Sequence, residues 1–382
     1  MTTPCVKLDA DAFLNHFGAL KDPRQVGKID HLLVDVLVIA LLATICGAET
    51  WSQIQAFGKR KRALLAELLP LPHGIPSKHT FQRVFAHLDP RAFEAAFRGW
   101  IGDLVEHTAG RLIALDGKTV RGSGKGLPRG RALHLVHAWA VGNRLLLGQL
   151  AADKKSNEIT ALPELLKLLD LKGAVVTIDA AGTHKPIAAQ IVDADADYIL
   201  AVKKNQPKLY AAVTGLLAPA TTGAPLATAS TAENGSCGHG RIELRRVWAM
   251  DATDLPMAGE WKGLASAILV ESERRIDGVL TREHRYYMSS LPPDDATRLG
   301  RRIRGHWGVE NTLHWSLDVA FHEDDCLVYA GNSPENLALL RKIALTVLHR
   351  DTTATASLAE RRKEAGWDDA YLLEILRRGI TE

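Results

Sequence analysis

Cysteine, long apolar runs and net charge are all scarce in this chain of 382 residues. Its four cysteines (Cys5, Cys46, Cys237 and Cys326) form no CxxC pair, which argues against a disulfide framework and against a thiolate zinc site. The longest apolar run, from Val36 to Gly47, is well short of the roughly 20 residues that a membrane-spanning helix needs. We therefore expect reduced, structural thiols and no membrane partner.

A secretory signal is missing as well. The first residues contain no basic segment followed by an apolar one and a small-residue cleavage site, so the sequence predicts a cytoplasmic protein. The 47 Lys and Arg residues nearly balance the 44 Asp and Glu residues, and the net charge of +3 points to no particular partner. A content of 46% hydrophobic and 24% charged residues is typical of a globular protein. The length predicts two or three structural units.

Residues 10–105 carry apolar side chains at helical spacing, which predicts an all-helical N-terminal domain. One helix should begin after Ser77, because its hydroxyl can cap the first turn. Phe81, Val84 and Phe85 fall on one face of that helix, and we expect this face to be buried.

The pattern changes at residue 111 to short aliphatic runs, separated by helical patterns. This alternation predicts an α/β core with a mixed sheet. Residues 218–237 read as a loop that leads into a strand-rich insertion, and a helix is expected over 294–321. We divide the chain into a helical N-terminal domain, a two-part core, a β-rich insertion and a helical C-terminal segment, over residues 1–106, 107–217 with 291–350, 218–290 and 351–382.

Two aspartates stand directly after buried apolar runs. Asp116 follows Leu115 and precedes a glycine, and Asp179 follows the run that ends at Ile178. An Asp-Gly pair alone is more typical of a turn. Two acids at the carboxyl ends of separate strands, however, occupy the position where α/β sheets place their sites. The sequence therefore predicts that Asp116 and Asp179 belong to one site.

A third acid, Glu310, lies in the helix predicted over 294–321. On a regular helix it falls in a polar stripe with a four-residue period, formed by His306, Glu310, His314 and Asp318. The helix would pack its neighbouring apolar stripe on the sheet and hold Glu310 where it can face the two aspartates. The alternative is an exposed polar face with histidines that bond internally.

Three converging carboxylates suit Mg²⁺ or Mn²⁺, and two such ions support an in-line phosphoryl displacement. A zinc site made of His306, Glu310 and His314 competes with this interpretation. Ligands at four-residue steps diverge by about 40° per step on an α-helix, and their order does not match the HExxH motif. We therefore predict phosphodiester chemistry with two Mg²⁺ or Mn²⁺ ions and without a small organic cofactor.

Positive charge is concentrated in the segments next to these acids. Contacts from Lys and Arg to phosphates supply most of the affinity of a protein for nucleic acid, so these segments predict a DNA-binding surface. The predicted DNA contacts are Lys118, Arg121, Lys203, Lys204, Asn205, Arg301, Arg304, His306, Asn311 and His314.

Two motifs make the chain recognisable, Leu115-Asp116-Gly117-Lys118 and His306-Trp307-Gly308-Val309-Glu310-Asn311. They resemble motifs of the DDE-type transposases of bacterial insertion sequences, in the H-repeat-associated branch. The resemblance covers nearly the whole chain, including Asp22-Pro23-Arg24 near the N-terminus. It implies a ribonuclease-H-like core, in which helices flank a mixed sheet, with a β-rich insertion between the second aspartate and the glutamate.

The same resemblance implies that the three acids are catalytic metal ligands, namely Asp116, Asp179 and Glu310. A metal-activated water would cut DNA at the element ends, and the freed 3′-hydroxyl would then attack target DNA. The N-terminal domain would help to recognise the ends. The implied partners are double-stranded DNA, as element ends and target, and a second copy of the chain in a homodimer on DNA, acting at the bacterial nucleoid.

Two alternatives remain open. The chain could be a metal-dependent DNA nuclease without strand transfer, or a catalytically silent DNA-binding protein derived from a transposase. The wider superfamily places Tyr, Arg and Lys at fixed offsets around the glutamate, and these offsets fall here on Ile303, His306 and Leu317. Because no lysine is carried over, the resemblance does not imply hairpin formation at the DNA ends.

Overall fold

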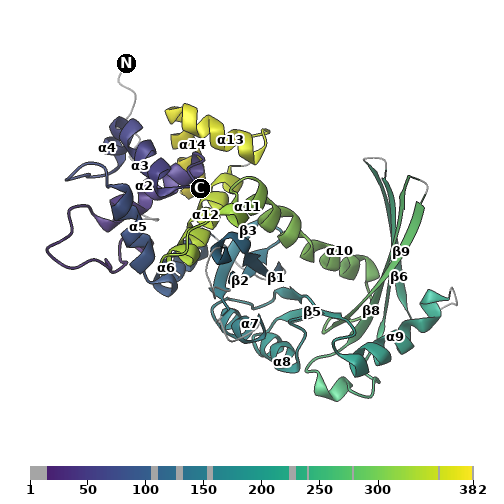
Figure 1. Ribbon diagram of the computed structural model, residues 1–382. Coiled ribbons are helices and arrows are strands. Elements are labelled where there is room, and N and C mark those ends of the chain that lie inside the picture. Colours follow the sequence, from purple (N-terminus) through teal and green to yellow (C-terminus); the bar gives the residue numbers. More distant parts are fainter. Residues whose placement is uncertain are drawn as a thin grey trace.

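The computed structural model of the chain contains a nine-stranded mixed sheet, and helices from both chain ends gather at one side of it (Figure 1). The structure describes residues 15–104, 111–125, 132–152, 158–222, 229–238, 241–277, 279–351 and 353–380.

The N-terminal residues that the structure describes form helices and no strand. The Ser77 hydroxyl accepts a hydrogen bond from the Thr80 N–H at 3.2 Å, and Phe81, Val84 and Phe85 are fully buried. The predicted cap and buried face are therefore confirmed. The helices are α2 (Leu33–Ile45), α3 (Trp51–Arg60), α4 (Arg62–Leu68), α5 (Lys78–His87) and α6 (Pro90–Leu104).

Five strands form the core of the sheet, in the order β3-β2-β1-β4-β5. The strand β2 is antiparallel to both of its neighbours, whereas β4 and β5 run parallel to β1. This is the mixed α/β arrangement expected of a ribonuclease-H-like core, so the predicted fold class is confirmed. The strands are β1 (Leu112–Val120), β2 (Leu133–Ala140), β3 (Leu145–Ala151), β4 (Val175–Ile178) and β5 (Asp197–Val202).

Four antiparallel strands extend this sheet beyond β5, in the order β9-β8-β7-β6. The loop expected over 218–237 is wrong at both ends, because α9 (Pro207–Thr221) reaches into it and β6 occupies its second half. The small and polar residues of β6 show no period of two. This strand forms because it pairs with β7 along its whole length, at the edge of the sheet. The four strands are β6 (Ser230–Gly238), β7 (Arg241–Asp251), β8 (Ser266–Ile276) and β9 (Val279–Ser289).

Different helices cover the two faces of the sheet. Successive side chains of a strand point to opposite faces. Val175 lies in a core cluster with Leu299 and Ile303 of α10 (Ala296–His306), whereas Val176 lies in the larger cluster, which α7 (Glu158–Lys167) and α8 (Lys185–Asp193) complete. The face that α10 covers is the one that carries the site described below.

Three C-terminal helices pack back onto the N-terminal ones (Figure 1). Helix α12 (Ser333–Arg350) contacts α2, α5 and α6 as well as β3, and α13 (Leu358–Trp367) and α14 (Asp369–Ile380) also belong to this helical part. Helix α2 is buried on nearly all sides, so both ends of the chain contribute to one helical core. Among the described ranges, no helix has the length and apolar character needed to span a membrane.

Candidate active site

Asp116 and Asp179 lie at the same level of two neighbouring parallel strands. The strands β1 and β4 pair in register up to Leu115 and Ile178, and the two aspartates are the next residues along each chain. Neighbouring strands are about 4.8 Å apart, which places the two residues side by side. The expectation that Asp116 ends its strand is wrong, because β2 continues to pair with β1 as far as Val120.

Backbone N–H groups hold one oxygen of each carboxylate. The Oδ1 of Asp116 accepts a hydrogen bond from the Gly117 N–H at 2.9 Å. The Oδ1 of Asp179 accepts two, from Ala181 at 3.0 Å and Gly182 at 3.2 Å. The local chain thus fixes both acidic side chains where β4 ends.

The helix predicted over 294–321 is not regular. After α10 the chain forms a π-helical segment, η3 (Val309–His314), and then α11 (Trp315–Val319). A regular α-helix would turn His306 and His314 about 80° away from each other, whereas one π-turn adds a residue and reduces the difference to about 20°. Both histidines can therefore face the sheet, as their contacts show.

His306 contacts β4 next to Asp179. Its Nδ1 lies 2.9 Å from the Thr177 hydroxyl. Burial lowers the pKa of His306 to about 4, although the nearby Asp179 charge and the Thr177 bond act in the opposite direction. The ring is therefore neutral near pH 7, and one of its nitrogens is engaged inside the protein.

His314 contacts both β1 and β2. Its Nδ1 lies 3.6 Å from Asp116 Oδ2, and its Nε2 lies 3.2 Å from the Nδ1 of His137. Burial lowers the pKa of His314 to about 3, and the charges of Lys118 and Lys342 add to this effect. Near pH 7 the contact with Asp116 is therefore between a carboxylate and a neutral ring, and it is not an ion pair.

Glu310 lies on the helix between the two histidines, four residues from each, and its side chain is exposed. Ile303 and Leu317 stand where the wider superfamily has Tyr and Lys around the glutamate, and both are buried in the core. In the part of the chain that the structure describes, no three His, Cys, Asp or Glu side chains lie close enough together to hold a metal ion.

The donor chemistry of these acids nevertheless fits a divalent cation. Asp116 and Asp179 offer carboxylate oxygens on adjacent strands, and Glu310 lies on the helix that packs over them. Oxygen donors of this kind suit Mg²⁺ or Mn²⁺. The zinc alternative gains no support, because His306 and His314 bond to different strands, β4 and β2.

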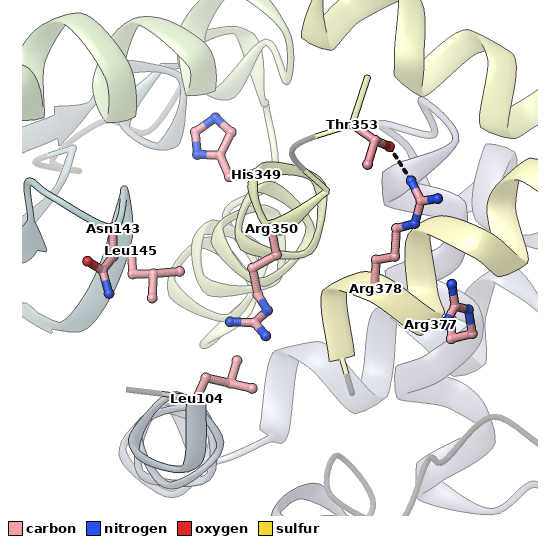
Figure 2. Close-up of a pocket in the computed structure, with 8 residues that line it drawn as sticks. All are labelled: Leu104, Asn143, Leu145, His349, Arg350, Thr353, Arg377 and Arg378. Carbon is pink, nitrogen blue, oxygen red and sulfur yellow. Dashed lines mark hydrogen bonds between the residues drawn. The ribbon is translucent and has the colours of Figure 1, made fainter. Parts of the chain in front are cut away.

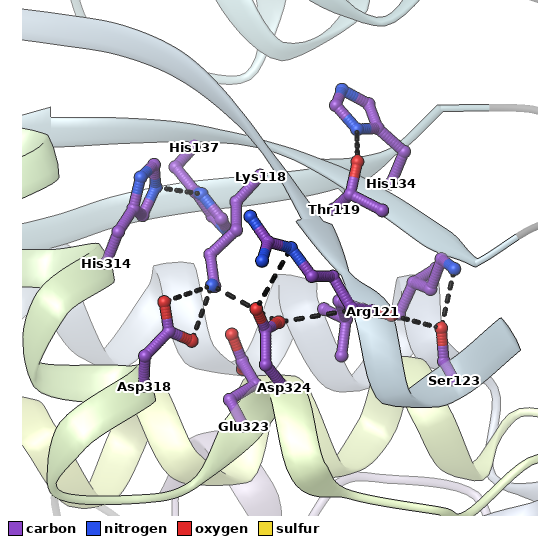
Figure 3. Close-up of polar contacts among 12 residues, drawn as sticks. Lys118, Thr119, Arg121, Ser123, His134, His137, His314, Asp318, Glu323 and Asp324 are labelled. Carbon is purple, nitrogen blue, oxygen red and sulfur yellow. Dashed lines mark hydrogen bonds and ion pairs between the residues drawn. The ribbon is translucent and has the colours of Figure 1, made fainter. Parts of the chain in front are cut away.

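Lys118 lies inside the protein, where only 7% of its side chain is exposed. Figure 3 shows its side chain pointing toward Asp318 and Asp324. Its ammonium group lies 2.6 Å and 2.8 Å from the two oxygens of Asp318 and 3.5 Å from Asp324. Asp318 belongs to the predicted polar stripe, and Asp324 lies in the acidic turn that follows it. The ammonium group is therefore already paired with acidic side chains of the protein itself.

Apart from His306 and His314, the other predicted DNA contacts are exposed. Lys203 and Lys204 are exposed at the end of β5, and the Asn205 amide donates to the Ala180 carbonyl at 2.8 Å, directly beside Asp179. Arg121 exposes 80% of its side chain, although its Nε lies 3.4 Å from Asp324. The remaining exposed residues lie on α10 and η3, and they are Arg301, Arg304 and Asn311.

A close backbone contact holds the turn that carries Asp324 against the segment that follows β1. A Cβ atom added to Gly122, in η1 (Arg121–Gly124), would lie 2.4 Å from the Cys326 carbonyl oxygen and 2.7 Å from that of Asp324. Only glycine allows the turn η4 (Glu323–Asp325) to pack this closely against η1.

We expect Gly122→Ala to destabilise the protein by about 1–3 kcal/mol, because an added methyl group must push two backbone segments apart. The melting temperature measured by circular dichroism would fall accordingly. The matched control is Gly102→Ala on α6, where an added Cβ meets nothing within 4 Å; it should be neutral or stabilising by up to about 1 kcal/mol. Equal melting temperatures for both variants would contradict the packing argument.

Three buried polar groups leave little trace in the sequence, namely His137, Glu323 and Lys342. Lys342 of α12 and Glu323 are both fully buried and form an ion pair at 3.2 Å. Burial lowers the pKa of Lys342, against the opposing charge of Glu323. His137 is also fully buried. The only signal in the sequence was a histidine within the apolar run of β2, which does not reveal its partner.

A cavity of about 520 Å³ lies elsewhere, between the β2–β3 turn and the C-terminal helices (Figure 2). None of the three predicted acids lines it. The Arg378 guanidinium on its wall is bound to Asp351 at 3.0 Å, so part of its charge is neutralised. The lining residues are Leu104, Asn143, Leu145, His349, Arg350, Thr353, Arg377 and Arg378.

The chain matches two family models. The model described as "Transposase DDE domain" matches residues 107–347, and the model described as "DDE_Tnp_1-associated" matches residues 14–101. A solved structure of the piggyBac transposase synaptic complex with hairpin DNA aligns over 99% of this chain and 79% of its own, at 11% identity and a TM-score of 0.41, a likeness too low to support an argument.

Several bacterial proteins are similar over nearly the full length. The "H repeat-associated putative transposase YhhI" of Escherichia coli (strain K12) is 36% identical over 97% of this chain and 98% of its own. The "Putative transposase YncI" of Escherichia coli O157:H7 is 37% identical over 97% of this chain and 95% of its own. The resemblance stated from the sequence is confirmed: the chain belongs to the DDE transposase family, in its H-repeat-associated branch.

Proposed function

We propose that this protein cuts DNA at the ends of an insertion sequence and joins the freed ends to target DNA, with Asp116, Asp179 and Glu310 as ligands of two Mg²⁺ or Mn²⁺ ions. The observation that supports this most strongly is the register of β1 and β4, since it places the two aspartates side by side. The histidines on either side of Glu310 contact the strands that carry or adjoin these aspartates, and these contacts support the proposal that Glu310 belongs to the same site.

The protein residues have separate tasks in this reaction. Bound divalent ions would supply activation of the attacking hydroxyl group and stabilisation of the leaving oxygen. Asp116 and Asp179 are fixed by backbone N–H groups, so they are ready to bind a cation with little rearrangement. Glu310 is exposed and would complete the site when the substrate DNA is in place.

The exposed cations around the acids would guide the DNA backbone. Arg304 and Arg301 lie on α10, six and nine residues before Glu310, and Lys203 and Lys204 lie on the Asp179 side. Double-stranded element ends and target DNA are the proposed partners. Two ends must be joined in one reaction, so we also propose a homodimer on DNA.

We expect the double variant Arg301→Ala/Arg304→Ala to bind DNA more weakly and with a weaker salt dependence. Each lost phosphate contact should reduce the slope of log K against log salt concentration by about 1. Fluorescence anisotropy with labelled duplex DNA at several salt concentrations measures this slope. Lys363→Ala, an exposed cation on α13, is the control. A slope that both variants leave unchanged would exclude Arg301 and Arg304 from the DNA-binding surface.

The proposed reaction is tested with the purified full-length protein, Mg²⁺ or Mn²⁺, and DNA that carries the element's own ends. Joined products are expected with the unaltered protein. Cleavage without joining would instead identify a nuclease. DNA that is bound but never cut in either metal would identify a DNA-binding protein without catalysis.

A further inference from the structure

His137 lies directly opposite Asp116 in the sheet. The two residues are register partners of the antiparallel strands β2 and β1, and side chains of such partners project from the same face. The His137 side chain is fully buried, whereas 16% of the Asp116 side chain is exposed. A buried polar ring therefore lies beside a carboxylate that is only partly exposed.

His314 joins these two side chains from the helix above them. Its two ring nitrogens point in different directions, one to Asp116 Oδ2 at 3.6 Å and the other to His137 Nδ1 at 3.2 Å. The two imidazole rings are 5.2 Å apart between centroids. Figure 3 shows the contact between His314 and His137. With Asp116, three elements that are distant in sequence, β1, β2 and η3, contribute to one series of polar contacts.

The Asp116 carboxylate, which accepts at the end of this series of contacts, determines which ring nitrogens carry protons. An ionised carboxylate only accepts hydrogen bonds, and a neutral imidazole has one donor and one acceptor nitrogen. If His314 donates from Nδ1 toward Asp116, its Nε2 must accept, and His137 must donate from Nδ1. The Nε2 of His137 is then an acceptor, and it is buried with no hydrogen-bond partner among the described residues. One pair of tautomers therefore satisfies every contact.

Burial lowers the pKa of His137, and the charges of Lys342, His314, Lys118 and His134 act in the same direction. The contact between His314 and Asp116 depends on direction and distance. At 3.6 Å the Nδ1 to Oδ2 separation is longer than a hydrogen bond, and a shift of about 0.5 Å would close it, as expected when a site tightens on its substrate.

We propose that His314 and His137 are positioning residues that orient the Asp116 carboxylate for a divalent cation. This inference rests on the proposed function, since it requires Asp116 to be a metal ligand. A partner that holds a ligating carboxylate fixes the direction of its free oxygen lone pairs, and the loss of such a partner typically costs about 10–100-fold in metal affinity.

The test is a calorimetric titration of the full-length, metal-free protein with Mn²⁺. We expect His314→Ala to weaken Mn²⁺ binding by about 10–100-fold. His314→Asn places an amide where Nδ1 stood and should recover most of the affinity. His314→Gln places its amide where Nε2 stood and should not. Thermal melts by circular dichroism show whether each variant is folded.

The comparison of the Asn and Gln variants separates positioning from packing. Equal Mn²⁺ affinities for these two folded variants would overturn the proposal, because a packing role does not depend on which nitrogen is replaced. Asp116→Asn in the same titration separates the two proposals from each other. If Asp116→Asn binds Mn²⁺ as the unaltered protein does, the ligand assignment fails. If it loses binding while His314→Ala retains full affinity, only the positioning inference fails.

Discussion

Replacing Asp116 by Asn should lower the rate of DNA strand cleavage by at least about 1000-fold. A divalent ion contributes several kcal/mol to the stabilisation of transition-state charge, and each 1.36 kcal/mol corresponds to about a tenfold change in rate. The amide has the size of the carboxylate but lacks its charge, so the cation would lose a ligand without a change in packing. Asp179→Asn and Glu310→Gln should have similar effects.

The measurement is single-turnover cleavage of labelled element-end DNA, with DNA affinity determined in parallel. Affinity should change little, because the neighbouring cations supply it. Asp277→Asn in the exposed turn between β8 and β9 is a matched control, since it makes the same chemical change far along the chain from the acids. Cleavage by Asp116→Asn at the rate of this control would remove Asp116 from the catalytic residues.

Replacing Lys342 by Met should destabilise the protein by about 3–5 kcal/mol. Lys342 Nζ and Glu323 Oε1 form an ion pair at 3.2 Å, and neither side chain is exposed. Removal of one partner from such a pair leaves an uncompensated charge in the interior, which costs about this much. The loss would be a large part of the roughly 5–15 kcal/mol that separates a typical folded protein from its unfolded state.

The midpoint of urea-induced unfolding measures this loss, provided that the slope of the transition does not change. The double variant Lys342→Met/Glu323→Gln removes both charges and should recover much of the stability, because a neutral pair leaves no isolated charge. If the single variant unfolds at the same urea concentration as the unaltered protein, the pair contributes nothing to folding.

The fold could be predicted where the local hydrophobic pattern matches the burial of the same residues in the structure. The aliphatic runs of β1, β4 and β5 are buried on both faces, and this leaves a clear signal. The strand β6 has no such signal, since residues such as Ser230 and Asn234 are neither aliphatic nor alternating. Its conformation comes from its pairing with β7, an interaction that no short window of sequence contains.

The site was predictable to the extent that it depends on strand ends. Acids that directly follow buried apolar runs identified Asp116 and Asp179, although the strand of Asp116 continues to Val120. The π-turn at Glu310 was not predictable, because a spacing of four residues suits a regular helix as well. Nor was the burial of Lys118, whose partner Asp318 lies 200 residues further along the chain. Charge clusters in sequence therefore indicate where cations are, but not which of them face the solvent.

The packing of α12 against α2, α5 and α6 also determines the order in which the protein can mature during synthesis. Helix α2 leaves the ribosome some 300 residues before α12, with apolar side chains on nearly every side. Until α12 arrives, this helix lacks a major part of its covering, and contacts of such long sequence separation form slowly. Nascent chains that stop before Ser333 should therefore be sensitive to proteases and should associate with chaperones that bind apolar segments.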